Sequence, residues 1–178
     1  MGFSGALPEY WDLVDVDGHR TGGVHAREQG SLPEGLFHLV ATVCVARPDG
    51  TVLLQQRAVG REFELKWEFS GGSAITGETS AQACLRELRE EAGICVLEEK
   101  LALVGRHAEG SAPVDLYLAR VPQDVSIVID PAEVNDFDWG PLHRVEELLS
   151  EGSMAEPWVD RLGALGPSLA NTIGPACR

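Results

Sequence analysis

The strongest pattern in the sequence is a pair of apolar stretches joined by a short turn. Residues 37–46 are apolar or β-branched at nearly every position, which is typical of a strand buried on both faces. Residues 47–50, Arg-Pro-Asp-Gly, have the composition of a reverse turn with Pro at its second position, and residues 51–57 predict the returning strand. Shorter stretches predict further strands at residues 66–70, 101–106, 114–121, 125–129 and 134–139.

Helices are predicted among these strands. Residues 79–92 are good helix formers, and Gly93 follows at the position where many helices end. Residues 142–149 and 158–165 predict two more helices. Mixed strands with two or three helices indicate an α/β or α+β sandwich. In the first helix an apolar face toward the core is predicted by residues at helical spacing, Ala81, Leu85, Leu88 and Ala92.

The chain has the size and composition of one globular domain, with 178 residues of which 44% are hydrophobic and 24% charged. Residues 1–35 form an N-terminal extension, in which Asp17-Gly18 predicts the turn of a short hairpin. We expect the main domain at residues 36–166 and a tail at residues 167–178.

Charge and composition exclude several classes of function. Acidic residues outnumber basic ones by 28 to 14, a net charge of −14, which argues against nucleic-acid binding because that depends on Lys and Arg. The apolar stretch at residues 39–46 is far shorter than the roughly 20 residues of a membrane helix, so no membrane contact is expected. No signal-peptide pattern opens the chain, and no C-x-x-C pair occurs, so we expect a cytoplasmic protein with reduced cysteines, Cys44, Cys84, Cys95 and Cys177.

The candidate chemistry lies in the first predicted helix. Glu87, Glu90 and Glu91 stand at positions i, i+3 and i+4, which predicts three carboxylates on one face, opposite the apolar one. Such like charges repel, and two divalent cations such as Mg²⁺ would relieve the repulsion. Arg86 is placed to brace Glu87, and the glycines at residues 71–72 let backbone approach a ligand closely. These features predict a pocket for a metal-bound polyphosphate.

An isolated acidic run of this kind is more often a solvated helix face, but the wider spacing decides against that interpretation. The sequence contains the pattern G-x5-E-x7-R-E-U-x-E-E-x-G-U, where U is aliphatic, without a departure. The protein therefore resembles the Nudix family, over roughly residues 36–150. The matching positions are Gly72, Glu78, Arg86, Glu87, Leu88, Glu90, Glu91, Gly93 and Ile94.

The resemblance implies a fold and a reaction. The fold would be an α/β/α sandwich with a mixed β-sheet. The reaction would be hydrolysis of a phosphoanhydride bond in a nucleoside diphosphate linked to another group, X, with Mg²⁺ or Mn²⁺. By position, Glu87, Glu90 and Glu91 would be metal ligands with the Gly71 carbonyl, and Arg86 would orient Glu87. Glu78 would support the loop before the helix.

The general base stays open among five carboxylates. Glu90 and Glu91 are candidates within the motif, and Glu109, Asp115 and Glu133 are candidates outside it.

Substrate contacts are predicted less sharply. Basic residues lie on the strand and loop that lead to Gly71, and they would hold a substrate phosphate or belong to an ordinary solvated loop: Arg57, Arg61 and Lys66. Nearby aromatic residues stack on a base or, the interpretation we favour, fill the core: Phe63, Trp67 and Trp139.

Two alternatives accompany the hydrolase interpretation. The N-terminal region resembles the Nudix branch that includes isopentenyl-diphosphate isomerases, whose chemistry needs a cysteine just before the motif. Residues 67–72, Trp-Glu-Phe-Ser-Gly-Gly, carry glycines there, and the motif is intact. His25 and His38, which an isomerase would use for metal, are then structural histidines. A non-catalytic nucleotide-binding module is the second alternative. Family resemblance also implies a homodimer.

Overall fold

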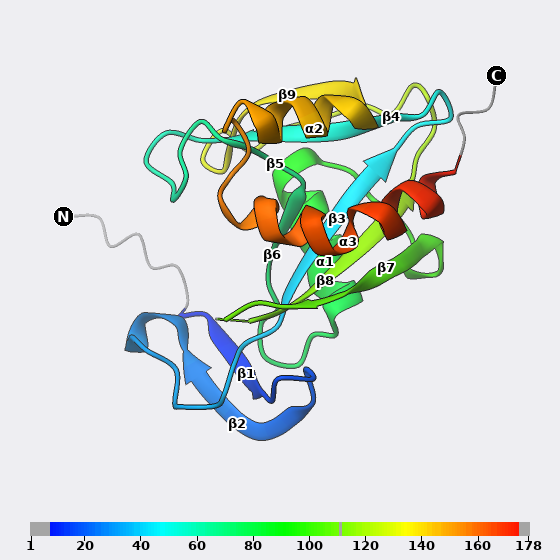
Figure 1. The fold of residues 1–178 in the computed structure, drawn as a ribbon. Coiled ribbons are helices and arrows are strands. Elements are labelled where there is room, and N and C mark those ends of the chain that lie inside the picture. Colours follow the sequence, from blue (N-terminus) through cyan, green and yellow to red (C-terminus); the bar gives the residue numbers. More distant parts are fainter. Residues whose placement is uncertain (1–7, 111, 175–178) are drawn as a thin grey trace.

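The computed structural model describes residues 8–110 and 112–174, whose main element is a mixed seven-stranded sheet. Strand β3 lies at its centre, antiparallel to β4 and β6 and parallel to β8 (Figure 1). The remaining strands pair with β4 or β8, so the mixed sheet predicted from the sequence is confirmed. The strands are β3 (Val40–Ala46), β4 (Thr51–Arg57), β5 (Trp67–Glu68), β6 (Ser70–Ser73), β7 (Leu101–Ala108), β8 (Pro113–Arg120) and β9 (Val134–Pro141).

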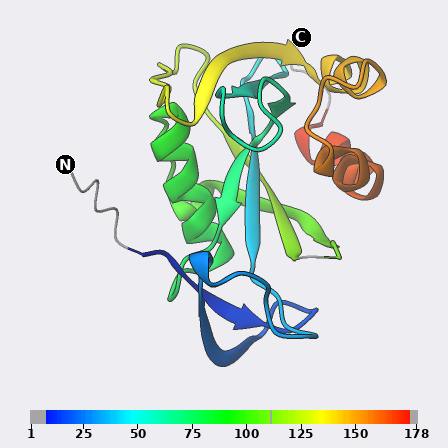
Figure 2. The same ribbon diagram turned by 90° about the vertical axis from the view of Figure 1, so that its left-hand side faces the viewer.

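Helices cover both faces of this sheet. Helix α1 (Ser80–Ala92) lies on one face, and α2 (Leu142–Ser150) with α3 (Pro157–Ile173) lies on the other (Figure 2). Successive side chains of a strand point to opposite faces, so β3 supplies both cores. Ala41 and Val43 pack in the core beneath α1, whereas Cys44 packs beneath α2 and α3. The apolar run of β3 is therefore buried on both sides, as its composition predicts.

Helix α1 begins and ends where its sequence predicts. Thr79 is the N-cap, and it exchanges hydrogen bonds with Gln82 in a capping box. Gly93 ends the helix with φ of +68°, a left-handed conformation that glycine adopts without a Cβ penalty. The buried face is rotated from the predicted one, because Ala83 and Cys84 are fully buried.

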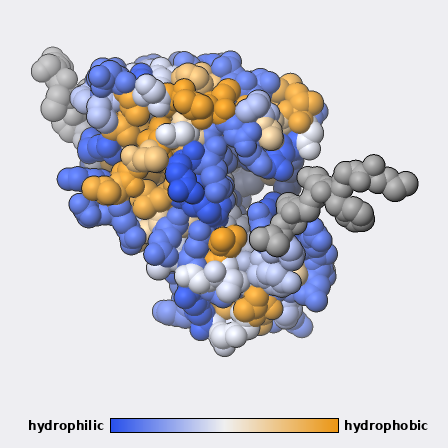
Figure 3. All heavy atoms as spheres, turned by 180° about the vertical axis from the view of Figure 1, so that it is seen from behind, coloured by the Kyte–Doolittle hydropathy of each residue, from blue (hydrophilic) through white to orange (hydrophobic). Residues whose placement is uncertain are grey.

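The N-terminal hairpin forms a second, two-stranded sheet of β1 (Tyr10–Val14) and β2 (Arg20–Ala26), followed by the short helix η1 (Arg27–Gln29). It lies at the bottom of Figure 1 and forms the lower lobe in Figure 3. The hairpin is joined to the loop before α1 by hydrogen bonds. Tyr10 O accepts from Thr76 N at 2.8 Å, and Asp12 Oδ2 accepts from Gly77 N at 2.9 Å.

The expected strand at residues 125–129 is wrong. Val125 and Ile127 pack against the core beneath α1, which explains why these positions are apolar. The segment nevertheless bonds the end of α1 and not a strand, since Val128 N donates to Ala92 O at 2.9 Å. The last carbonyl groups of an α-helix have no hydrogen-bond partner within the helix. Here the carbonyl of Ala92 accepts from a backbone N–H group of this segment, which a strand would have donated to a neighbouring strand.

The boundary expected after residue 166 falls inside α3, which continues to Ile173. Leu169, in the second half of the helix, is fully buried beneath the sheet. No helix among residues 8–110 and 112–174 is long and apolar enough to cross a membrane. Cys177 lies outside the described residues.

The burial of Leu169 predicts that the second half of α3 stabilises the fold. Leu169→Ala should lower the free energy of unfolding by about 3 kcal/mol, because it leaves a cavity in the core. Urea denaturation measures the change. Leu97→Ala, at a position 63% exposed, is the matched control and should have little effect. Equal losses in the two variants would mean that this half of α3 does not belong to the packed fold.

Candidate active site

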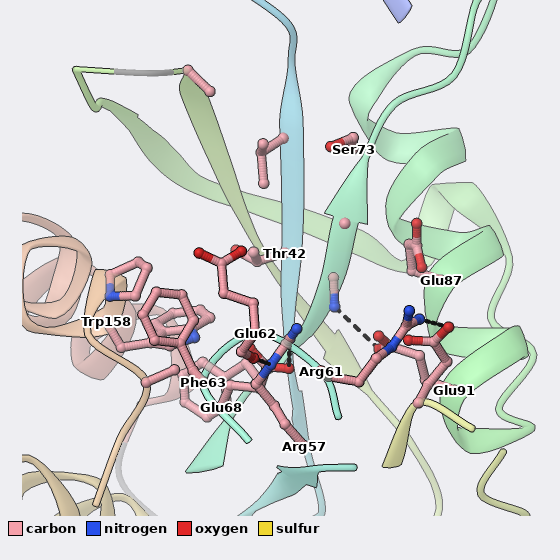
Figure 4. A pocket seen from close by; sticks show the side chains of 18 of the residues that line it. Thr42, Arg57, Arg61, Glu62, Phe63, Glu68, Ser73, Glu87, Glu91 and Trp158 are labelled. Carbon is pink, nitrogen blue, oxygen red and sulfur yellow. Dashed lines mark hydrogen bonds and ion pairs between the residues drawn. The ribbon is translucent and has the colours of Figure 1, made fainter. Parts of the chain in front are cut away.

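A cleft of about 750 Å³ lies between α1 and α3, across the middle of the sheet. Its lining comes from β3, β6 and α1, and from the loop that joins β4 to β5. The start of α3 and the loop before β9 complete it. Figure 4 shows Glu87 and Glu91 on one side of the cleft and Phe63 and Trp158 on the other.

Glu91 is a nearly buried carboxylate, 7% exposed. Its Oε2 accepts hydrogen bonds from Ser70 Oγ, from Gln55 Nε2 at 3.1 Å and from Gly71 N at 3.2 Å. Burial outweighs these bonds and raises the pKa of Glu91 to about 8. The expectation that all three carboxylates lie opposite the apolar face is therefore wrong for Glu91. It lies on the buried side of α1, because the sheet beneath it carries polar partners.

Arg86 joins the loop before α1 to the helix. Its Nε donates to Glu78 Oε1 at 2.9 Å, and its Nη2 donates to Ser73 O at 3.0 Å. Its Nη1 contacts Glu87 Oε1 at 2.8 Å and Glu90 Oε2 at 3.3 Å. Arg86 therefore contacts all three glutamates that precede Glu91 in the motif.

Two glycines allow the close packing of this region. A Cβ on Gly71 would lie 2.7 Å from Thr42 Cα in the adjacent strand β3. A Cβ on Gly72 would lie 2.6 Å from Glu87 Cδ, so glycine is what lets that carboxylate approach the strand. The pKa of Glu87 is raised by burial, against the lowering effect of Arg86.

The chemistry of these donors fits a hard divalent cation. Glu91 and Glu87 are carboxylates held in surroundings that disfavour their charge, which a cation would offset. Within the described ranges, the tight cluster of potential ligand atoms lies elsewhere, at Asp15, Asp17 and His19. That cluster is the turn of the hairpin, where Asp15 Oδ1 accepts from two backbone N–H groups.

The predicted substrate-binding residues separate in the structure. Arg57 and Arg61 line the cleft, but each contacts a glutamate, Glu68 and Glu133 respectively. Lys66 does not line the cleft, because its Nζ donates to Gly152 O at 2.6 Å.

The candidate bases also separate. Glu90, Glu91, Glu109 and Glu133 line the cleft, whereas Asp115 does not. Asp115 is 2% exposed, and both its carboxylate oxygens accept from Arg106. It is therefore not placed to act on a substrate in this cleft.

The remaining predicted residues lie mainly in packed positions. His25 Nε2 lies 3.2 Å from Gly30 O, and the ring of His38 stacks on Trp11 at the edge of the cleft, with 4.2 Å between ring centroids. Trp67 and Trp139 pack against the two cores. Phe63 packs against the core too, and it also faces the cleft.

Other residues of the cleft carry no sequence signal that would have identified them. Ser70 and Gln55 are buried behind the cleft and matter because they contact Glu91. Arg161 lines the cleft and matters because it contacts Glu109, 52 residues earlier. Asp130 enters through the irregular segment after α1, where its N–H donates to Glu91 O at 3.1 Å. Their positions follow from pairings between distant segments, which local patterns do not contain.

Comparison with known proteins agrees with this geometry. Residues 36–162 match the family model of the NUDIX domain. The chain belongs to the Nudix family. It is 33% identical over 147 residues to an uncharacterized Nudix hydrolase of Listeria monocytogenes, covering 81% of this chain and 86% of the relative.

Further relatives show how broad the likeness is. An isopentenyl-diphosphate Delta-isomerase of Cereibacter sphaeroides is 33% identical over 140 residues, covering 70% of this chain and 76% of the isomerase. The crystal structure of a Deinococcus radiodurans protein superposes with a TM-score of 0.70 at 19% identity, covering 83% of this chain and 92% of that one. The Nudix fold predicted from the motif is thereby confirmed.

The raised pKa of Glu91 predicts a pH effect on the metal-free protein. The pKa of Glu91 is about 8 in the folded chain, against the ordinary 4.5, so the folded state binds this proton more tightly than the unfolded state. Stability of the wild type should therefore fall as pH rises from about 5 to about 8. Glu91→Gln removes this contribution. The melting temperature of the variant, relative to that of the wild type, should therefore rise as pH increases across this range.

Melting curves in chelator, at several pH values, make the comparison. Glu99→Gln, an exposed glutamate on the surface, is the control and should follow the wild type. Mg²⁺ at pH 8 should raise the melting temperature of the wild type more than that of Glu91→Gln. Parallel pH curves for wild type and Glu91→Gln would contradict the assigned burial of this charge.

Proposed function

We propose that this Nudix protein hydrolyses a phosphoanhydride bond in a nucleoside diphosphate linked to another group, with Mg²⁺ or Mn²⁺ as cofactor. The observation that carries the proposal is the buried carboxylate of Glu91, which lines the same cleft as Glu87 and Glu90. Buried carboxylates are retained at a cost in stability, so a cation that they hold explains their presence.

In this proposal the chain's own residues have distinct tasks. Glu87, Glu90 and Glu91 would hold the cation with the Gly71 carbonyl. Bound there, the cation would polarise phosphate oxygens and supply an activated water. Arg86 keeps Glu87 and Glu90 beside each other, through contacts of 2.8 Å and 3.3 Å. Arg61 contacts Glu133 in a pair that is 40% and 37% exposed, which solvent weakens, so it is free to exchange its partner for a substrate phosphate.

Isomerase activity is the second candidate, favoured by the likeness to isopentenyl-diphosphate isomerases. None of the three described cysteines lines the cleft, and Cys44 and Cys84 are buried in the two cores. Burial raises the pKa of Cys84 to about 12 and that of Cys44 further, so neither is a ready thiolate. The cleft therefore supports hydrolysis better. The homodimer stays a prediction.

Activity assays test the proposal. Release of phosphate and of nucleoside monophosphate should be measured over nucleoside triphosphates, nucleotide sugars, dinucleoside polyphosphates and dinucleotide cofactors, with Mg²⁺ and with Mn²⁺. Isomerisation of isopentenyl diphosphate should be measured in parallel. We expect metal-dependent hydrolysis of one class and no isomerisation.

Variants then identify the residues. Glu91→Gln and Glu90→Gln should each lower kcat by about a hundredfold or more, because each removes a charge that holds the cation. Glu68→Gln should have a milder effect, because Glu68 contacts Arg57 and lies outside the motif. Glu99→Gln should keep full activity. Near-normal turnover in Glu91→Gln would remove that residue from the site, and isomerisation without hydrolysis would overturn the proposal.

A further inference from the structure

The cleft is larger than its carboxylate side requires. A volume of about 750 Å³ falls in the range of about 300–1,000 Å³ that encloses a whole drug-sized molecule. Figure 4 shows Phe63 and Trp158 across the cleft from Glu87 and Glu91. A diphosphate held at the motif glutamates would leave the side of Phe63 and Trp158 for one of the groups that flank it. We call this side the far wall, formed by Phe63, Pro157, Trp158, Arg161 and Glu109.

Each arginine that lines the cleft, in the part of the chain the structure describes, is already in contact with a carboxylate. The contacts of Arg86 lie on the side of the cleft that carries the motif glutamates. The side chains of Arg61 and Glu133 are each more than one-third exposed. The pairs are Arg27–Glu9, Arg57–Glu68, Arg61–Glu133, Arg86 with Glu78, Glu87 and Glu90, and Arg161–Glu109.

The Arg161–Glu109 pair of the far wall is the most enclosed of these. Its side chains are 13% and 16% exposed, and they meet at two points, one of them Nη2 to Oε2 at 3.1 Å. The guanidinium also lies 5.3 Å from the centroid of the Trp158 ring. Separating such a pair would leave an uncompensated charge in a poorly solvated place, which is strongly unfavourable. Arg161 is therefore not available to an incoming anion.

The rest of the far wall offers an anion no better partner. Phe63 is a half-buried aromatic residue, Trp158 is only 1% exposed and belongs to the core, and the neighbouring Glu62 is an exposed acid on the cleft. Phe63 has φ of +55°, a left-handed conformation that is uncommon for a residue with a Cβ. Its loop thus holds an aromatic side chain at the cleft in spite of backbone strain, as is common where a ligand is clamped.

We propose that the far wall receives an uncharged group of the substrate, and that the Arg161–Glu109 pair enforces this choice by neutralising the cation that would otherwise attract an anion. The inference rests on the proposed hydrolysis and narrows its substrate class. Substrates with a phosphate or carboxylate on the group that enters this side are rejected. Glu109 and Arg161 thus determine specificity together, because Glu109 neutralises the charge of Arg161.

Matched substrates measure the selection directly. Three pairs differ by an anionic group on a flanking moiety: UDP-glucose and UDP-glucuronate, NADH and NADPH, and dephospho-coenzyme A and coenzyme A. For the pair that contains the best substrate, wild-type kcat/KM should favour the neutral member by about tenfold or more, roughly 1.4 kcal/mol, because the anionic group would lose hydration without finding a free cationic partner. Equal or better hydrolysis of the anionic member of that pair would overturn the inference.

Two variants should move this preference in opposite directions. Glu109→Gln leaves Arg161 with an uncompensated charge, so the neutral-to-anionic ratio of kcat/KM should fall by about fivefold or more. Arg161→Gln leaves the carboxylate of Glu109 instead, so the ratio should rise. If the pair only supports the fold, the neutral-to-anionic ratio of kcat/KM should change in the same direction in both variants or not change at all. That outcome also overturns the inference. Glu147→Gln, in the surface pair with Arg144, is the control.

Melting curves establish that both variants fold, and a binding measurement separates this inference from the proposed function. If the wild type hydrolyses none of the compounds, the proposed function is refuted. Titration of inorganic phosphate in metal-free buffer would then decide the role of the pair. Phosphate binding gained in Glu109→Gln and absent in Arg161→Gln would support the far-wall charge balance, and equal binding by all proteins would refute it.

Discussion

The contacts of Arg86 hold the candidate site together. One guanidinium meets the carboxylates of Glu78, Glu87 and Glu90 and the carbonyl of Ser73. Without it, the adjacent acids of α1 would repel one another and the loop before the helix would lose its anchor. Because its side chain is only 20% exposed, these contacts are little screened by solvent. The arrangement of the motif therefore depends on a single cation of the chain itself.

The N-terminal hairpin extends this support. Arg20 donates to Glu78 O at 2.6 Å, and Asp12 holds the backbone of Gly77, next to it. Glu78 in turn contacts Arg86. The loop before α1 is therefore held by contacts with the hairpin as well as by contacts with Arg86. A segment that precedes the family domain thus contacts the very loop on which the motif depends.

The two sides of the cleft differ in how their charges are balanced. Nine carboxylates and five arginines line it within the described residues, an excess of acid that two divalent cations would balance. The excess gathers at the motif, where Glu91 is buried without a cationic side chain among its hydrogen-bond partners. On the far wall the half-buried Glu109 is matched by Arg161. One side is thus suited to metal and phosphate, and the other to a neutral group.

The sequence by itself determined the helix of the motif and the identity of its acids. Helix period, capping at Thr79 and the stop at Gly93 are local, because they depend on hydrogen bonds within a few residues. The apolar run of β3 likewise showed its double burial. The spacing of the motif then indicated the family, and with it the mixed sheet.

Only the tertiary structure decided which carboxylate is buried and which arginines are neutralised. Glu91 lies on the core side because Gln55 and Ser70 come beneath it from other strands. Arg161 meets Glu109 across 52 residues, and the segment at 125–129 bonds the end of α1 where the sequence predicted a strand. The physical reason is the same in each case. Solvation and charge pairing depend on neighbours in space, and the pairing of distant segments sets those neighbours.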